Sequence, residues 1–437
     1  MDMPGAAGWV CAVCNAHVDI ATAFTWRCPN ATDTDRHHAL QLVQAIAPLR
    51  GDDDPNPFVA FRRYLAWDSF AAANGMSEGA RTALLRDVDD DIAAVAGTGF
   101  HVTPFERADA LSDALGFGVD GGVWIKDETH QVAGSHKARH LVTVLLHLLT
   151  AEALGLAPWS DQSGRPPLAI ASCGNAAFAA ATLAAAMKWP LRVFVPPTAD
   201  PVVLTRFGEL RAEIDVCPRR ASDPAGDPCM HRFREAVAAG AIPFTVQGTE
   251  NAWCLDGGRT IGWEMARHFE EAVVGPPLDR LFIQVGAGTF AACTIAGFRM
   301  SGVVPRLHAV QTDSCAPLAR AWDASRRLGG AMSAAAHWTQ CMWPWEPVGS
   351  SAADGILDDE TYDWLPVVRA MADGNGSPIV VSEARVIEAN ELARATTAIH
   401  VSPTGTAGLA GLLAARDSMG SSERVAVVFS GVQRSLP

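Results

Sequence analysis

Short runs of β-branched and other apolar residues alternate with longer alanine-rich segments from about residue 122 to the end of the chain. Such runs, bounded by turn residues, are typical of buried strands, and the alanine-rich segments are typical of helices. We predict strands at 123–125, 168–171, 191–195, 281–285, 307–310 and 425–429, with helices at 176–187 and 290–298 directly after two of them. This rhythm predicts an α/β fold with a mostly parallel sheet.

The N-terminal part of the chain has a different character. The first 50 residues contain three cysteines, followed closely by two histidines, and show no strong periodic pattern. A stretch rich in Asp and Pro at 52–57 then marks a turn before a helix-like segment at 58–73. A chain of 437 residues is too long for one small core. We therefore expect an N-terminal extension over residues 1–50 and a larger α/β body.

Composition and charge exclude several classes of protein. The net charge of −14 argues against a general affinity for nucleic acid or for an anionic membrane. No long apolar run is free of charged residues, and the N-terminus lacks the basic-then-apolar order of a signal peptide. The ten cysteines are scattered, which favours reduced thiols over a disulfide framework. We expect a cytoplasmic protein with no nucleic-acid or membrane partner.

The chain contains only three lysines, Lys126, Lys137 and Lys188. Arginine cannot replace lysine where an amine must lose its proton and condense with a carbonyl, because guanidinium stays charged. Two of the three lysines fall within the segment 125–139, which indicates amine chemistry there. The alternative is that both are ordinary surface cations.

The lysine segment resembles the strand-loop-helix of fold-type-II pyridoxal-phosphate (PLP) enzymes, the tryptophan-synthase-β type. A Lys-x-Glu strand end at 126–128 leads to Gly-Ser-x-Lys at 134–137, where a helix is expected to begin. The resemblance implies that Lys137 is catalytic and carries PLP as a Schiff base, and that Ser135 binds substrate. His136 stands where the family usually has Phe. This change is either a packing substitution or a titrating group beside the cofactor.

The loop at 171–177 resembles the family's Ser-Ser/Thr-Gly-Asn loop. The resemblance implies that Asn175 binds the ring hydroxyl of the cofactor. It also implies that the substrate carboxylate is bound by Ser172, Cys173 and Gly174. Without the resemblance, a Gly/Asn turn that opens an alanine-rich helix explains the same residues.

A glycine-rich turn at 285–289 follows a predicted strand and opens a helix, where backbone amides form an anion site. The resemblance implies that the cofactor phosphate is held by Gly286, Ala287, Gly288 and Thr289. The same turn fits a dinucleotide fingerprint through Ala291 and Asp313, so an NAD-dependent oxidoreductase is an alternative.

The segments 401–410 and 427–431 resemble the family's Pro-x-Gly-Ala-Ala helix start and its final strand. The second likeness implies that Ser430 lies near the pyridine nitrogen. A hydroxyl there stabilises a neutral ring, which is a weaker electron sink than a protonated one and suits elimination or replacement at the β or γ carbon.

Three further segments, 56–65, 98–104 and 257–264, resemble threonine synthases and threonine dehydratases. The resemblance implies a lyase that breaks a carbon-oxygen or carbon-nitrogen bond in a small amino acid by β- or γ-elimination. A β-replacement synthase of the cysteine synthase type is an alternative, and so is a non-catalytic binding protein. The family also implies two open, twisted, mostly parallel sheets flanked by helices, and a homodimer. We expect a large domain from residues 51–137 and 250–437, and a smaller mobile domain from 138–249.

The cysteines of the extension resemble a zinc ribbon found in some threonine synthase relatives. That ribbon has four cysteines, but here Cys28 is followed by Pro29 and Asn30, and the fourth is missing. The remaining candidates for a tetrahedral zinc site are Cys11, Cys14 and Cys28 with His37 or His38. The alternative is a degenerate ribbon that binds no metal.

Overall fold

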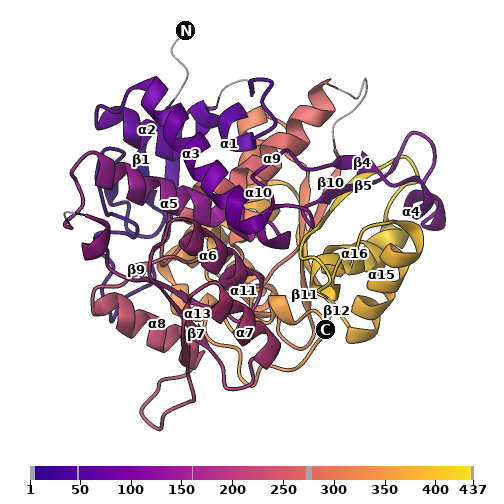
Figure 1. Cartoon of the computed structure of the whole chain (residues 1–437). Coiled ribbons are helices and arrows are strands. Elements are labelled where there is room, and N and C mark those ends of the chain that lie inside the picture. Colours follow the sequence, from indigo (N-terminus) through magenta and orange to yellow (C-terminus); the bar gives the residue numbers. More distant parts are fainter. Residues whose placement is uncertain (1–4, 47–48, 160, 272–277, 435–437) are drawn as a thin grey trace. The chain divides into compact units, whose positions relative to one another are not determined.

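The computed structural model describes residues 5–46, 49–159, 161–271 and 278–434, and it divides the chain into two units (Figure 1). The first unit contains residues 1–101, 131–133 and 137–260, and the second contains residues 102–130, 134–136 and 261–437. The chain passes from one unit to the other several times around the lysine segment. The domain boundaries expected at residues 50, 137 and 250 stay a prediction.

The first unit contains a parallel sheet of four strands in the order β8-β7-β6-β9. Its strands are β6 (Leu168–Ala171), β7 (Leu191–Val195), β8 (Glu213–Val216) and β9 (Ile242–Pro243). The successive strands are connected by α6 (Asn175–Ala186), α7 (Pro201–Glu209) and α8 (Pro228–Ala238). Strand β6 is buried at every position, as expected for a strand covered on both faces.

A separate antiparallel sheet lies in the N-terminal region, which the sequence pattern did not predict. Strand β1 (Ala6–Cys11) pairs with β2 (His17–Asp19) on one side and β3 (Leu40–Gln44) on the other. The strands are short, and the segment 20–39 between β2 and β3 contains no helix or strand.

The helix-like segment 58–73 is interrupted. It forms α1 (Pro57–Ala60), η1 (Arg62–Tyr64) and α2 (Ala66–Ala73). The Tyr64 carbonyl accepts a hydrogen bond from Arg259 at 2.9 Å, and the amides of Ala66 and Trp67 donate to the Asp256 carboxylate at 2.9 and 3.1 Å. These distant partners replace helical hydrogen bonds at the break. The prediction of one continuous helix over 58–73 was therefore wrong.

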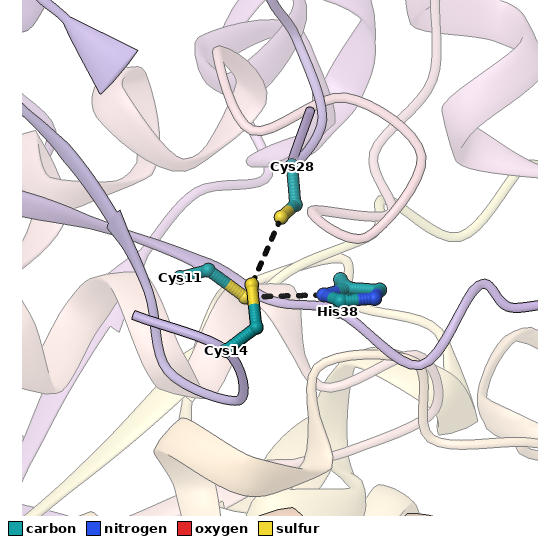
Figure 2. Close-up of side chains that lie close together, drawn as sticks. All are labelled: Cys11, Cys14, Cys28 and His38. Atoms are coloured by element: carbon teal, nitrogen blue, oxygen red, sulfur yellow. Dashed lines mark hydrogen bonds between the residues drawn. The ribbon is translucent and has the colours of Figure 1, made fainter. Parts of the chain in front are cut away.

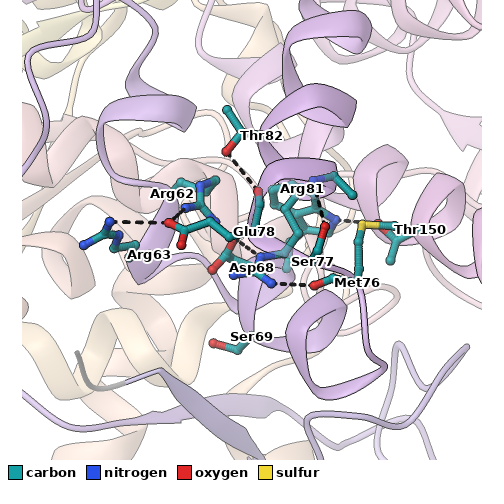
Figure 3. A network of polar contacts seen from close by, with 12 residues as sticks. Arg62, Arg63, Asp68, Ser69, Met76, Ser77, Glu78, Arg81, Thr82 and Thr150 are labelled. Atoms are coloured by element: carbon teal, nitrogen blue, oxygen red, sulfur yellow. Dashed lines mark hydrogen bonds and ion pairs between the residues drawn. The ribbon is translucent and has the colours of Figure 1, made fainter. Parts of the chain in front are cut away.

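Buried ion pairs join this segment to α3 (Glu78–Ala96) (Figure 3). The Arg62 guanidinium is nearly buried and pairs with Asp68 and with Glu78, at 2.6 Å in the second case. Arg81 donates to the same Asp68 carboxylate at 2.8 Å. The nearby Arg62 charge lowers the pKa of Glu78. In this segment, which resembles threonine synthases, Arg62 therefore has a structural role.

The second unit contains a six-stranded sheet in the order β12-β11-β10-β13-β5-β4. Its strands are β4 (Phe105–Arg107), β5 (Gly122–Asp127), β10 (Arg280–Gln284), β11 (Arg306–Thr312), β12 (Ser377–Val381) and β13 (Arg424–Phe429). Only β4 pairs antiparallel among these strands; the other pairings are parallel. All six predicted strands therefore exist, and the fold has two mostly parallel sheets flanked by helices, as expected.

The core of the second unit lies between this sheet and α16 (Pro403–Ala415). Val123 and Ile125 of β5 belong to one hydrophobic cluster with Phe282, Val427 and residues of α16. Side chains alternate along a strand, so Trp124 and Lys126 point to the opposite face. There Trp124 lies 5.6 Å from the Phe269 ring of α9 (Cys254–Glu271), measured between ring centroids.

The remaining helices complete each unit. The first unit also contains α5 (Lys137–Ala153) and η3 (Gln162–Gly164), and η2 (Val132–Gly134) spans a crossing between the units. The second also contains α4 (Asp109–Ala114), α10 (Thr289–Ser301), α11 (Pro317–Arg327), α12 (Ala331–Ala336), α13 (Trp338–Cys341), η4 (Asp354–Ile356), α14 (Trp364–Asp373), α15 (Glu383–Thr396) and η5 (Arg416–Ser418). Within the described part of the chain, none of the helices has the length and apolar character needed to cross a membrane.

A close contact between α5 and the start of α9 gives a test of the packing in the first unit. A Cβ atom at Gly257 would lie 1.8 Å from the Arg139 carbonyl oxygen. We expect Gly257→Ala to destabilise the protein by about 1–3 kcal/mol, because backbone must shift to relieve the clash. Thermal unfolding followed by circular dichroism measures the loss. Gly79→Ala is the matched control, since a Cβ there meets nothing within 4 Å, and its melting temperature should be unchanged or slightly raised. Equal losses in both variants would contradict the packing.

Candidate functional site

Lys126 lies in β5 and is fully buried. Its ammonium group pairs with the Glu264 carboxylate and donates to the Thr103 carbonyl at 2.7 Å. The Thr103 amide donates to the same carboxylate at 3.1 Å. Lys126 is thus a structural cation inside the second unit, and its interpretation as a surface cation was wrong.

Lys137 is the first residue of α5 and is half-buried. The chain reaches it through two residues with positive φ, Ala133 at 58° and Gly134 at 72°. A Cβ at Gly134 would also lie 2.6 Å from a methyl group of Val432, so glycine is required there on both counts. A helix N-terminus is the position in a helix where a positive charge is least favoured.

His140 lies one turn after Lys137 on α5 and is fully buried. Burial, together with the nearby charge of Lys137, lowers the pKa of His140 to about 3. The His140 imidazole is therefore neutral at neutral pH, and its Nδ1 lies 2.9 Å from the Cys254 carbonyl. His140 could not be selected from the sequence, because the burial of α5 on nearly every side is a tertiary effect.

Ser430 follows strand β13 and is buried beside His136 in the second unit. The His136 amide donates to Ser430 Oγ at 3.1 Å, and the imidazole Nδ1 also hydrogen-bonds to that oxygen. The His136 ring stacks on Phe290 with centroids 3.7 Å apart and planes 11° apart. His136 thus occupies an aromatic packing position and also contacts the hydroxyl predicted to lie near the pyridine nitrogen.

The glycine-rich turn lies between β10 and α10, and Gly286, Ala287, Gly288 and Thr289 are all buried. Gly288 has φ 92° and is the N-cap of α10, and within the described structure no side chain caps that helix. A Cβ at Gly288 would lie 2.8 Å from Thr361 Cγ2. The amides at the start of α10 therefore remain a suitable anion site.

The acidic segment 358–363 packs against this turn, which the sequence pattern did not predict. The Thr289 hydroxyl donates to Asp363, and the Asp363 amide donates to the Ala287 carbonyl at 2.8 Å. A Cβ at Gly286 would lie 2.1 Å from Asp358 Oδ2, so that carboxylate lies directly against the glycine. The sequence does show four acidic residues within 358–363. Their position against the glycine-rich turn depends on long-range packing, so it could not be predicted from the sequence.

The loop at 172–175 precedes α6 in the first unit. Cys173 and Gly174 are exposed, while Ser172 and Asn175 are half-buried. The Gly174 amide donates to Ser172 Oγ at 3.2 Å, and Gly174 is the N-cap residue of α6. Ser135, by contrast, is fully buried in the second unit. The substrate-binding roles of these residues stay predictions.

The N-terminal cysteines come together with a histidine in the first unit (Figure 2). One potential ligand atom from each of Cys11, Cys14, Cys28 and His38 lies within 4.8 Å of the others. His37 is not part of this group; its ring is partly exposed, and its Nδ1 lies 3.9 Å from Asp35. Of the two histidines that the sequence left open, His38 and not His37 therefore lies beside the three cysteines.

Most of the chain is similar to known proteins. Residues 97–431 match the family described as "Pyridoxal-phosphate dependent enzyme". A threonine synthase of Synechocystis sp. is 24% identical over 335 residues, which cover 75% of each chain. The solved structure of threonine deaminase isoform 2 from Solanum lycopersicum, in its processed form, has a TM-score of 0.58 and 16% identity, covering 82% of this chain and 86% of that one. Diaminopropionate ammonia lyase from Escherichia coli gives 0.60 and 15%, covering 89% and 94%.

The protein belongs to the pyridoxal-phosphate dependent enzymes, and its fold is that of fold type II. The residues present fit this cofactor in chemical type. A half-buried amine begins α5, a glycine N-cap begins α10, and a buried hydroxyl follows β13. The family match also favours PLP over the nicotinamide alternative for the glycine-rich turn.

Lys126 and Lys188 give a matched test of the ion pair between Lys126 and Glu264. We expect Lys126→Met to lower the free energy of unfolding by about 3–5 kcal/mol, because Glu264 would be left as an uncompensated buried charge. Lys188 is exposed, so Lys188→Met should change stability by less than about 0.5 kcal/mol. Urea unfolding of the cofactor-loaded protein measures both. A Lys126→Met protein as stable as the control would show that the pair contributes nothing.

Proposed function

We propose that the protein is a PLP-dependent lyase that acts on a small amino acid by β- or γ-elimination, with Lys137 as the catalytic amine. The observation that carries this proposal is the difference among the three lysines. Lys126 is used in a buried ion pair and Lys188 is exposed, whereas Lys137 is half-buried at a helix start within the matched family region. The names of the relatives, a threonine synthase and two ammonia-releasing enzymes by their titles, support the reaction class.

When bound, PLP supplies an electron sink conjugated to the α-carbon of an amino acid. In this proposal the Lys137 amine would hold the cofactor covalently and, when free, would act as the general base that takes the α-proton of the substrate. The neutral His140 imidazole adds no second positive charge beside that amine.

The other predicted residues orient the reacting groups. When PLP is bound, its phosphate would be held by the backbone amides of Gly286, Ala287, Gly288 and Thr289, and its ring hydroxyl would be bound by Asn175. Ser430, which accepts a hydrogen bond from the His136 amide, would be the hydroxyl near the pyridine nitrogen. Ser172, Cys173, Gly174 and Ser135 bind the substrate. A homodimer in the cytoplasm remains our expectation from the resemblance.

Borohydride reduction tests the role of Lys137 directly. We expect purified protein to absorb violet light and, after reduction, to carry the cofactor on the peptide that contains Lys137. Lys137→Ala should remove both the adduct and at least about 10²–10⁴-fold of the activity, because the covalent link and the base are lost together. Lys188→Ala is the control and should retain the adduct. An adduct mapped to Lys126 or Lys188 would overturn the assignment.

Substrate class is tested by a screen of hydroxy-, phospho- and acyl-amino acids. Release of ammonia and an oxoacid supports elimination. Formation of a new amino acid only when a thiol is added would instead show the β-replacement alternative.

The acidic segment gives a test of the phosphate site. We expect Asp358→Asn to bind PLP roughly tenfold more tightly, about 1.4 kcal/mol, because a carboxylate against the amide turn repels phosphate. Titration of the cofactor-free protein, followed by absorbance, measures the affinity. Asp313→Asn removes the same charge at an exposed position and should leave affinity unchanged. Weaker binding by Asp358→Asn would place the phosphate away from Gly286.

A further inference from the structure

The Cys11, Cys14, Cys28 and His38 cluster, here called the N-terminal tetrad, has the spacing of a metal site. Cys14 and Cys28 sulfurs are 3.5 Å apart, and Cys11 Sγ lies 3.4 Å from His38 Nδ1 (Figure 2). Two sulfurs on a tetrahedral zinc ion are separated by roughly 3.8 Å, and a sulfur and a nitrogen by roughly 3.6 Å. Both distances are within a few tenths of an ångström of these values, and all four donors lie within 4.8 Å of one another, close enough to surround one ion after a shift of about 1 Å or less.

The donor types select the metal. Three thiols and one imidazole suit Zn²⁺, whereas Mg²⁺ and Ca²⁺ require oxygen ligands. Cys11, Cys28 and His38 are buried, and none of the tetrad cysteines is in a disulfide. Four protein ligands leave no open position for water, which is the arrangement of a structural zinc site rather than a catalytic one.

The surroundings of the tetrad are those of metal ligands. The Val13 amide lies 3.5 Å from Cys11 Sγ, and the Asn30 side-chain amide lies 3.4 Å from Cys14 Sγ, and both donate toward sulfur. N–H donors of this kind stabilise negative charge on a thiolate. His38 Nε2 lies 3.5 Å from an Asp35 carboxylate oxygen, which fixes Nδ1 as the atom that faces the sulfurs.

The segment 20–39 between β2 and β3 contains no helix or strand, and two of the four ligands lie on it. A loop of this length needs an additional constraint to hold one conformation. This loop also contacts the residues before α9. The Ala252 amide donates to the Trp26 carbonyl at 2.7 Å, and Arg36 pairs with Glu250 at 3.3 Å. A metal bound to the tetrad would therefore hold these contacts in place.

We propose that Cys11, Cys14, Cys28 and His38 bind one structural Zn²⁺ ion, which fixes the 20–39 loop against the segment 250–253 of the first unit. This site is independent of the PLP chemistry. It uses His38 where a ribbon would use a fourth cysteine.

Zinc content is the first measurement. Full-length protein, purified with its PLP and without chelators, should contain about one zinc per chain by inductively coupled plasma mass spectrometry. His38→Ala should lose at least about tenfold in zinc affinity. His37→Ala is the matched control, because it removes an identical side chain one residue away that lies outside the tetrad. It should retain full zinc content. Equal loss in both variants would overturn the assignment of the fourth ligand.

Cobalt substitution keeps the proposal testable if the variants fail to fold. The wild-type protein with Co²⁺ in place of zinc should show the intense visible bands of tetrahedral cobalt and a near-ultraviolet thiolate-to-cobalt band. Protein that contains no zinc when purified, and takes up neither zinc nor cobalt, would show that the tetrad is a cluster of hydrogen-bonded thiols. A cobalt spectrum without a thiolate band would likewise overturn the proposal.

Discussion

The parallel pairing of β5 with β13 is the constraint on which the arrangement of the second unit depends. It joins residues about 300 positions apart, with Lys126 opposite Val428 and Asp127 opposite Phe429. The pairing continues beyond the strands, since the Glu128 amide donates to the Phe429 carbonyl at 2.8 Å and the Val432 amide to the Gly134 carbonyl at 2.9 Å. Residues 125–128, Gly134 and His136 of the lysine segment are thereby positioned by backbone and side-chain contacts with residues 427–432.

The burial of Lys126 in this strand distinguishes it from Lys137, whereas the sequence pattern treated the two lysines alike. A lysine on β5 faces away from the α16 core, and its charge requires a carboxylate there, which Glu264 provides. Buried ion pairs contribute little net stability, but removal of one partner is costly. Lys126 therefore holds a strand in place, and Lys137 at the start of α5 lies outside this ion pair.

The sequence was sufficient for features that depend on local pattern and insufficient for those that depend on distant partners. Strands β6 and β7 lie at 168–171 and 191–195 as predicted, because a buried parallel strand is a continuous apolar run. The break before α2 was missed because its cause is Asp256, about 190 residues away. The choice between His37 and His38, and the position of Asp358 against Gly286, likewise depend on tertiary packing. Lys137 was selected from a local motif and from the scarcity of lysine in the chain, and its catalytic role stays a proposal.

The scarcity of lysine has a consequence for handling and labelling the molecule. Lys126 is fully buried and Lys137 is half-buried, so Lys188 is the exposed member of the three. Lys188 lies at the turn after α6, where its backbone adopts φ 50°. Among the lysine side chains, Lys188 is therefore the main target for amine-reactive dyes and for coupling to ester-activated surfaces. The same holds for enzymes that conjugate other proteins to lysine. Attachment through it would orient every copy of the protein in the same way.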